Sequence, residues 1–233
     1  MPTVEEWAII ALSLKVGAVA IALTLPIAFG LAWLLARKSF PGAFLLDALV
    51  HLPLVVPPVV TGWVLLIAFG ARGPLGRLLE ACCGATLMFR WTGAALAAAI
   101  MALPLMVRAI RISLESVDRR LEDAARSLGA TRWRAFATVT LPLAMPGVLA
   151  GAVLGFARSL GEFGATITFV SSIPGETRTL PLAIYAALQM PGGEDAVLRL
   201  ALISVVISVA ALALSEWLAR RLGANAGRAS HVL

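Results

Sequence analysis

The stretch AIIALSLKVGAVAIALTLPIAFGLAWLLA, residues 8–36, decides the class of this protein. Lys15 is its only charged residue, and a helix of about 20 apolar residues is enough to cross the hydrocarbon core of a membrane. The whole chain has the same character: 60% of its 233 residues are hydrophobic and 14% are charged, whereas soluble domains carry about 25% charged residues. A soluble core of this size cannot bury so much apolar surface, so the composition excludes an ordinary soluble enzyme and a disordered chain.

Further apolar stretches predict an all-α, polytopic bundle that forms one domain over 8–219. The predicted spans are 8–36, 43–71, 91–113, 143–163 and 196–219. The apolar piece 180–190 is too short to cross comfortably, so we expect a helix at the interface or one that re-enters the bundle. A sixth span at this piece is the alternative. Residues 220–233 are expected to form a tail.

Lysine and arginine residues concentrate at or after the ends of the first, third and fifth predicted spans. These residues are Arg37, Lys38, Arg108, Arg111, Arg119, Arg120, Arg126, Arg132, Arg134, Arg220, Arg221 and Arg228. Cytoplasmic loops carry the excess of positive residues in membrane proteins. The pattern therefore predicts a multi-pass protein of the inner (cytoplasmic) membrane, with the N-terminus outside and the C-terminus in the cytoplasm.

Small residues recur at four-residue spacing in the fourth predicted span, at Gly147, Gly151, Gly155 and Ser159. Such a stripe lets a second helix approach closely. A tightly packed bundle without a transport role would explain the stripe alone. Prolines in or beside several spans, which leave carbonyl groups to be satisfied inside the bundle, favour a channel or transporter over a plain anchor.

The segment between the third and fourth spans, DRRLEDAARSLGATRWRAFATVTLP at 118–142, has two helical faces. Leu121, Ala125 and Leu128 share one face of a first helix, and Gly129 can adopt the left-handed conformation that ends it. Thr131 is a candidate N-cap of a second, short helix.

Trp133 and Phe136 share one face of that second helix, which completes a positively charged helix–glycine–helix elbow with exposed apolar side chains. Such an elbow can insert into a groove on a soluble partner. It can equally rest on anionic lipid headgroups. The physical argument alone leaves both functions open.

The elbow resembles the coupling motif of bacterial ABC importer permeases. The family pattern is EAA, three residues, Gly, nine residues and Ile-x-Leu-Pro, and this chain matches it with Asp for Glu and Val for Ile. Glu122 stands next to the substituted Asp123. The resemblance implies an ABC type-1 transmembrane domain whose elbow docks on a separate ATP-binding subunit. The residues that would couple the two are Glu122, Asp123, Ala124, Ala125, Gly129, Trp133, Phe136, Leu141 and Pro142.

The chain has no phosphate-binding loop of its own. That loop needs the pattern GxxxxGK[ST], and neither Lys15 nor Lys38 follows such a glycine pattern. We therefore expect a transport subunit that is not itself an enzyme and holds no cofactor, with ATP and Mg on the partner. Neither the adjacent Cys82 and Cys83 nor the two histidines have metal-site spacing, so we expect no metal site.

Two further stretches resemble one branch of this family, the molybdate permease subunits. They are PLVVPPVVTGW at 53–63, followed by GARGPLG at 70–76, and RSLGEFGATITFVSSIPGETRTLPLAIYAALQMPGGE at 158–194. The resemblance implies molybdate import by a homodimer, with two ATPase subunits and an extracytoplasmic oxyanion-binding protein. Because the excess of cations serves membrane topology, we expect no nucleic-acid partner. Sulfate and thiosulfate permeases are close in pattern, and tungstate is nearly isosteric with molybdate, so these remain alternatives.

Hydroxyl groups near the outer end of the bundle are candidates for the path of the anion, because hydroxyls and backbone N–H groups stabilise anions. The candidates are Thr61, Thr166 and Thr168, with Ser171 and Ser172 beside them. Each of these groups more often forms a local bond to the backbone.

Two sets of charges are candidates for an outer gate or a contact with the binding protein. Arg158 and Glu162 are four residues apart near the outer end of the fourth span, where a self-neutralised pair is the simpler explanation. Glu176 and Glu194 fall in two predicted turns around 180–190.

A transporter driven by an ion gradient is the alternative from another class. It would need paired acidic residues in mid-membrane and internal repeats, whereas Asp47 and Glu162 lie towards span ends. A membrane enzyme would need a nucleophile–base or metal constellation, which the sequence does not offer.

Overall fold

The computed structural model describes residues 3–229, with no side chains described at 215, 216 and 218–229. Every regular element in this range is helical. The elements are α1 (Val4–Arg37), α2 (Ala43–Val55), α3 (Pro58–Phe69), α4 (Pro74–Cys83), α5 (Trp91–Ser116), α6 (Arg119–Ser127), α7 (Arg132–Ala135), the π-helical turn η1 (Phe136–Thr140), α8 (Leu141–Leu160), α9 (Gly164–Val170), α10 (Leu180–Leu188) and α11 (Glu194–Ala229).

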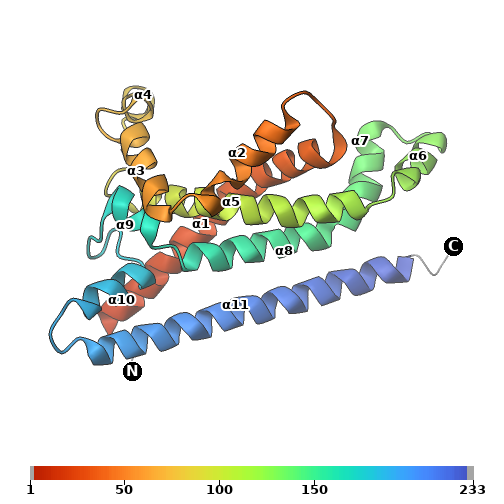
Figure 1. The fold of residues 1–233 in the computed structure, drawn as a ribbon. Coiled ribbons are helices and arrows are strands. Elements are labelled where there is room, and N and C mark those ends of the chain that lie inside the picture. The colour runs from red at the N-terminus through yellow and green to blue at the C-terminus, as the bar shows by residue number, and fades with distance from the viewer. Residues whose placement is uncertain (1–2, 230–233) are drawn as a thin grey trace.

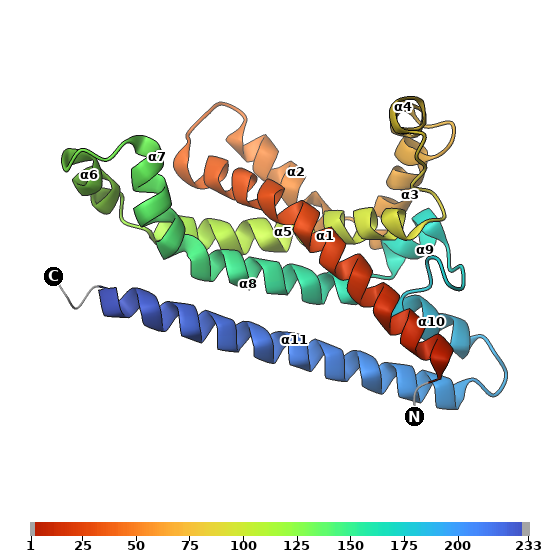
Figure 2. The same cartoon turned by 180° about the vertical axis from the view of Figure 1, so that it is seen from behind.

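The long helices run between two ends of the molecule (Figures 1 and 2). One end, which we call the elbow end, holds α6, α7 and the C-terminal ends of α1 and α11. The opposite end holds the start of α1 together with α4, α9 and α10. Among the described residues, four helices are long and apolar enough to cross a membrane, and the bent pair α2–α3 adds a fifth crossing if its two helices form one span. The all-α bundle of about five spans is thus confirmed.

The centre of the bundle is α5, which packs against α1 on one side and α8 on another. Five of its twelve buried residues are alanines: Ala94, Ala95, Ala97, Ala98 and Ala102. Without a hydrophobic driving force between helices in a membrane, close backbone approach between small residues is what holds such helices together.

The small-residue stripe on α8 makes the predicted close contact. A Cβ at Gly155 would lie 2.7 Å from Met106 Cγ, and one at Gly147 would collide with the side chain of Ser113, both on α5. The fourth member of the stripe, Ser159, faces Gly17 on α1, where an added Cβ would lie 2.9 Å from its hydroxyl. One face of α8 therefore contacts both α5 and α1.

Prolines break the second predicted span, so that 43–71 is two helices rather than one. The residue before a proline is forced into extended backbone, and Val56 (φ −73°, ψ 136°) and Pro57 (φ −53°, ψ 134°) both adopt it. Pro58 then starts α3, where its missing N–H costs nothing. The axes of α2 and α3 differ by 113°.

The last spans also differ in extent from the predicted ranges. Instead of starting at 143, the fourth span continues from the elbow without interruption over 132–160. The helix of the fifth span runs from Glu194 to Ala229, through most of the expected tail 220–233, of which 230–233 lie outside the described residues.

Between the fourth and fifth spans, α10 is the short helix expected at 180–190. The N–H of its Leu180 donates to Ser13 Oγ on α1 at 2.8 Å.

The contact between α5 and α8 generates a stability prediction. Gly147→Ala forces a Cβ against Ser113 and to 3.0 Å from the carbonyl oxygen of Ala109, and such overpacking costs about 1–3 kcal/mol. We expect a lower melting temperature for the purified protein in detergent. The matched control is Gly30→Ala, because a Cβ at Gly30 meets no atom within 4 Å and alanine favours helix. Equal melting temperatures for the two variants would contradict the packing described here.

Candidate functional site

The elbow begins with α6, which is capped at both ends; the sequence predicts the cap at Gly129, and the structure adds the one at Asp118. Asp118 Oδ1 accepts the N–H of Arg120 at 2.9 Å at the start of the helix. At its end Gly129 has φ +91°, the Gly129 N–H donates to Arg126 O, and the Ala130 N–H donates to Ala125 O, both at 3.0 Å. These two bonds form a Schellman motif, for which a left-handed residue is required.

The second helix of the elbow is the beginning of a membrane span. Thr131 caps α7 by accepting the N–H of Arg134 at 3.3 Å, as expected for its N-cap. The helix then widens into η1, where the Leu141 N–H donates to Phe136 O five residues back, and it continues as α8. The wide turn immediately precedes Pro142, whose ring would clash with a carbonyl four residues back in a regular helix. The predicted start of the fourth span at 143 misses this continuity. The sequence does carry a signal for it, because no glycine interrupts 132–146.

Glu122 ties the elbow to the bundle. Its Oε1 lies 2.9 Å from Arg37 Nη2 at the end of α1 and accepts the Thr140 hydroxyl of η1 at 2.7 Å. The side chain of Arg37 is 10% exposed, and Thr140 is buried. One carboxylate thus joins α6 to the ends of two membrane helices, through an ion pair with Arg37 and a hydrogen bond from Thr140, and a hydrogen bond to a charged acceptor is stronger than one between neutral groups.

Two large apolar side chains of the elbow face outwards. Leu128 is 90% exposed and Trp133 is 81% exposed. Phe136 is half-buried, and its ring meets those of Trp133 (centroids 6.0 Å apart) and Phe29 of α1 (6.1 Å) edge-on. Trp133 and Phe136 therefore lie together as predicted, but of the two only Trp133 is largely exposed.

The other predicted coupling residues surround this core of the elbow. Asp123 is exposed, and its carboxylate lies 3.8 Å from Arg126. Ala124 and Pro142 are also exposed, whereas Ala125 and Leu141 are half-buried. The structure thus places Glu122 at the anchor of the elbow and Asp123 on its outer surface, although the two carboxylates are neighbours in sequence.

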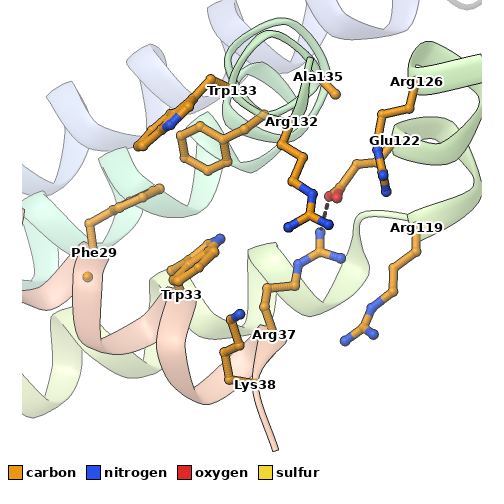
Figure 3. A pocket seen from close by; sticks show the side chains of 12 residues that line it. Phe29, Trp33, Arg37, Lys38, Arg119, Glu122, Arg126, Arg132, Trp133 and Ala135 are labelled. Carbon is orange, nitrogen blue, oxygen red and sulfur yellow. Dashed lines mark ion pairs between the residues drawn. The ribbon is translucent and has the colours of Figure 1, made fainter. Parts of the chain in front are cut away.

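A cavity of about 590 Å³ opens between the elbow and the end of α1 (Figure 3). Its lining comes from α1, α6, α7 and η1. The lining residues are Phe29, Gly30, Trp33, Arg37, Lys38, Arg119, Glu122, Arg126, Arg132, Trp133, Ala135 and Phe136. The aromatic rings gather on one side of the cavity and the arginines on another (Figure 3).

The predicted path residues lie on α3 and α9, which pack together away from the elbow. A Cβ at Gly62 of α3 would lie 2.5 Å from the carbonyl oxygen of Ala165 on α9, so this contact is close. Thr166 is buried, and the hydroxyl of Thr168 donates to Gly164 O at 2.9 Å. Thr61, which precedes Gly62, is half-buried.

Ser171 and Ser172 follow α9. Ser171 has φ +61°, a conformation that non-glycine residues seldom adopt, and its carbonyl accepts the hydroxyl of the buried Thr177 at 2.9 Å. The hydroxyl of Ser172 lies 3.4 Å from Arg178 Nε.

Arg158 and Glu162 form an ion pair at 2.7 Å (Nη1 to Oε2). Glu162 is not on the helix, because α8 ends at Leu160. Its Oε1 instead accepts the N–H of Ala165 at 2.8 Å in the first turn of α9, and its side chain is 2% exposed. The pair is therefore buried on the Glu162 side and connects α8 to α9.

The two outer glutamates have different surroundings. Glu176 Oε1 accepts the backbone N–H of Trp91 at 3.4 Å, at the start of α5, where a negative charge favours the helix. Glu194 is exposed and begins α11. Among the described residues, neither glutamate forms a hydrogen bond or an ion pair with Arg158 or Glu162.

Cys82 and Cys83 end α4 as exposed free thiols. Their sulfur atoms are 3.3 Å apart, and the hydrogen bond between the two thiols raises the pKa of Cys83. A raised pKa lowers the fraction of the reactive thiolate.

The anchor at Glu122 generates a prediction about local stability. Glu122→Gln removes the charge that Arg37 faces, and bonds to charged groups contribute about 1.5–3 kcal/mol. We expect the amides of α6 to exchange with deuterium about tenfold faster or more, since opening of the elbow becomes easier. Asp123→Asn makes the same change on the exposed neighbour and should leave exchange unaltered. Equal rates in the two variants would contradict the anchor.

Comparison with known proteins gives matches over nearly the whole chain. The family model described as "Binding-protein-dependent transport system inner membrane component" matches residues 10–224. The molybdenum transport system permease protein ModB of Escherichia coli (strain K12) is 57% identical over 226 residues, covering 97% of this chain and 99% of that protein. ModB of Haemophilus influenzae is 54% identical over 223 residues, covering 96% and 97%.

A more distant relative and a solved structure also match this chain. The sulfate transport system permease protein CysT of E. coli is 42% identical over 163 residues, covering 69% of this chain and 58% of that protein. A crystal structure of a bacterial alginate ABC transporter, in complex with its alginate pentasaccharide-bound periplasmic protein, superposes with a TM-score of 0.75 at 16% identity, covering 94% of this chain and 80% of that one. The chain belongs to the family of inner membrane components of binding-protein-dependent transport systems, and it is the permease component of an ABC importer.

Proposed function

We propose that this chain is the membrane-spanning subunit of an ATP-driven molybdate importer. The observation that carries the proposal is the elbow: a rigidly capped α6 that presents Leu128 and Trp133 outwards while Glu122 holds it to the membrane helices. The two molybdenum permeases match this chain almost from end to end, whereas the sulfate permease is less similar and matches a smaller share. Sulfate or thiosulfate import is therefore the second candidate.

The elbow transmits the movement of a separate ATP-binding subunit to the membrane helices. Leu128 inserts into a groove of that subunit, as an apolar helix face does in other complexes. When the subunits close on ATP, α6 moves with them. The bonds of Glu122 to Arg37 and Thr140 support transfer of this motion to α1 and α8, and α7 is continuous with α8. ATP and Mg bind to the partner subunit.

The elbow end faces the cytoplasm. Five cationic side chains gather there (Figure 3), namely Arg37, Lys38, Arg119, Arg126 and Arg132, and positive residues are retained on the cytoplasmic side. In the inner membrane, the N-terminus then lies on the outer side and α11 ends on the cytoplasmic side.

The complete importer holds two copies of this chain, two ATPase subunits and an extracytoplasmic binding protein for the oxyanion. Large apolar side chains on α2, α3 and α11 are exposed in the single chain, among them Phe44, Trp63 and Val206. Lipid and a second copy of the chain would cover them. The binding protein docks on the opposite end, where Glu176 and Glu194 lie.

The anion passes α3 and α9, whose broken helices resemble the interrupted segments that line substrate sites in other transporters. Thr61, Thr166 and Thr168 supply hydroxyls there. The buried pair Arg158–Glu162 controls access from the outer side, because Glu162 links α8 to the start of α9.

The test of the proposed function is uptake of labelled molybdate into vesicles that hold this chain, its ATPase and its binding protein. We expect uptake that needs ATP and is not reduced by excess sulfate. Uptake abolished by sulfate would move the assignment to sulfate, with the coupling argument intact. Uptake without any ATPase subunit would contradict the coupling through the elbow.

The coupling role of Gly129 is tested by Gly129→Ile in the same vesicles. A Cβ there meets no atom within 4 Å, so the substitution acts only through the left-handed backbone, which costs a β-branched residue about 1–2 kcal/mol. We expect about tenfold less molybdate imported per ATP hydrolysed. Gly129→Asn is the control, since asparagine tolerates this conformation. Normal coupling in Gly129→Ile would refute the elbow model.

A further inference from the structure

The cavity between α1 and the elbow is amphipathic. Phe29, Trp33, Trp133 and Phe136 form its apolar wall. Phe136 connects two of the other rings through edge-on contacts at 6.0 and 6.1 Å. This wall can accept hydrocarbon, and tryptophans are enriched where a membrane meets water.

The other wall is strongly cationic. Five cationic side chains line the cavity, against the single carboxylate of Glu122: Arg37, Lys38, Arg119, Arg126 and Arg132. Glu122 is already engaged by Arg37 and Thr140. Among the described residues, Lys38, Arg119 and Arg132 have no carboxylate partner, and the buried Nε of Arg37 has no hydrogen-bond partner. The wall thus offers unpaired charge to an anion.

The position of the cavity points to a membrane anion. It lies where the apolar span α1 ends at Arg37 and Lys38, the level at which lipid headgroups meet a spanning helix. Leu128, the most exposed apolar side chain of the elbow, is not part of the lining. A partner subunit can therefore engage Leu128 while a lipid occupies the cavity.

We propose that this cavity binds the phosphate headgroup of an anionic phospholipid, with the cations on the phosphate and the aromatic wall along the lipid's apolar part. A phosphodiester with attached hydrocarbon matches both walls, whereas inorganic phosphate uses only one. The site places an acidic lipid between α1 and the elbow, the two parts that Glu122 joins. Lipid binding at this cavity does not depend on which anion is transported.

The test measures retained lipid on the assembled complex of this chain with its ATPase. The complex is reconstituted in phosphatidylcholine vesicles that contain a minority of phosphatidylglycerol, extracted in mild detergent, and analysed for bound lipid by mass spectrometry. The variant Arg119→Gln/Arg132→Gln removes two charges from the cavity. Its matched control, Arg120→Gln/Arg134→Gln, removes two charges from the same helices outside the lining.

We expect the cavity variant to retain about tenfold less phosphatidylglycerol than the control, because each cation near a lipid surface contributes measurably to binding. Equal loss in both variants would show diffuse attraction to the membrane and would overturn the site. Displacement of the lipid from the unaltered complex by inorganic phosphate at equimolar concentration would assign the cavity to the soluble anion instead.

A second variant tests the site without changing any charge and without altering a residue of the elbow. Gly30 lines the cavity, and a Cβ there meets no atom within 4 Å. Gly30→Leu adds a side chain to the apolar wall without changing the net charge. We expect it to retain severalfold less phosphatidylglycerol than the unaltered complex, and undiminished retention would contradict occupancy of this cavity by lipid.

Discussion

The close approach of α5 to α8 is the contact on which the rest of the structure depends. In a membrane the surrounding lipid is as apolar as the side chains, so helices associate through tight packing of small residues. Gly147, Gly151 and Gly155 allow α8 to lie directly on α5. Because α8 continues from the elbow, this contact also sets where the elbow stands relative to the bundle.

Hydrogen bonds within the elbow hold its shape, and a contact between residues distant in sequence attaches it to the bundle. Its caps at Asp118, Gly129 and Thr131 satisfy backbone groups within a few residues along the chain. Its attachment rests on Glu122, which reaches Arg37 of α1, distant in sequence. A coupling element needs both properties, since a flexible elbow would absorb movement and a detached one would not pass it on.

The two ends of the molecule differ in construction. The elbow end carries continuous helices, cations and a cavity with an apolar wall. The opposite end carries the short helices α4, α9 and α10 and the start of α3 beyond the sharp bend from α2. Irregular backbone at membrane depth is tolerated where it is enclosed by protein or lines a polar cavity, which accords with an anion path past α3 and α9.

The sequence by itself determined the class, the approximate spans, the stripe on α8 and the caps of the elbow at Gly129 and Thr131. These follow from composition and from bonds between residues close in the chain, such as Ala130 to Ala125. Only the tertiary structure decided that Glu122 anchors while Asp123 is exposed, that Glu162 accepts an N–H from the first turn of α9, and that Arg37 and Arg132 line the same cavity. The physical reason is that neighbouring side chains on a helix point in different directions, and which of them meets a partner depends on helices that no local pattern encodes.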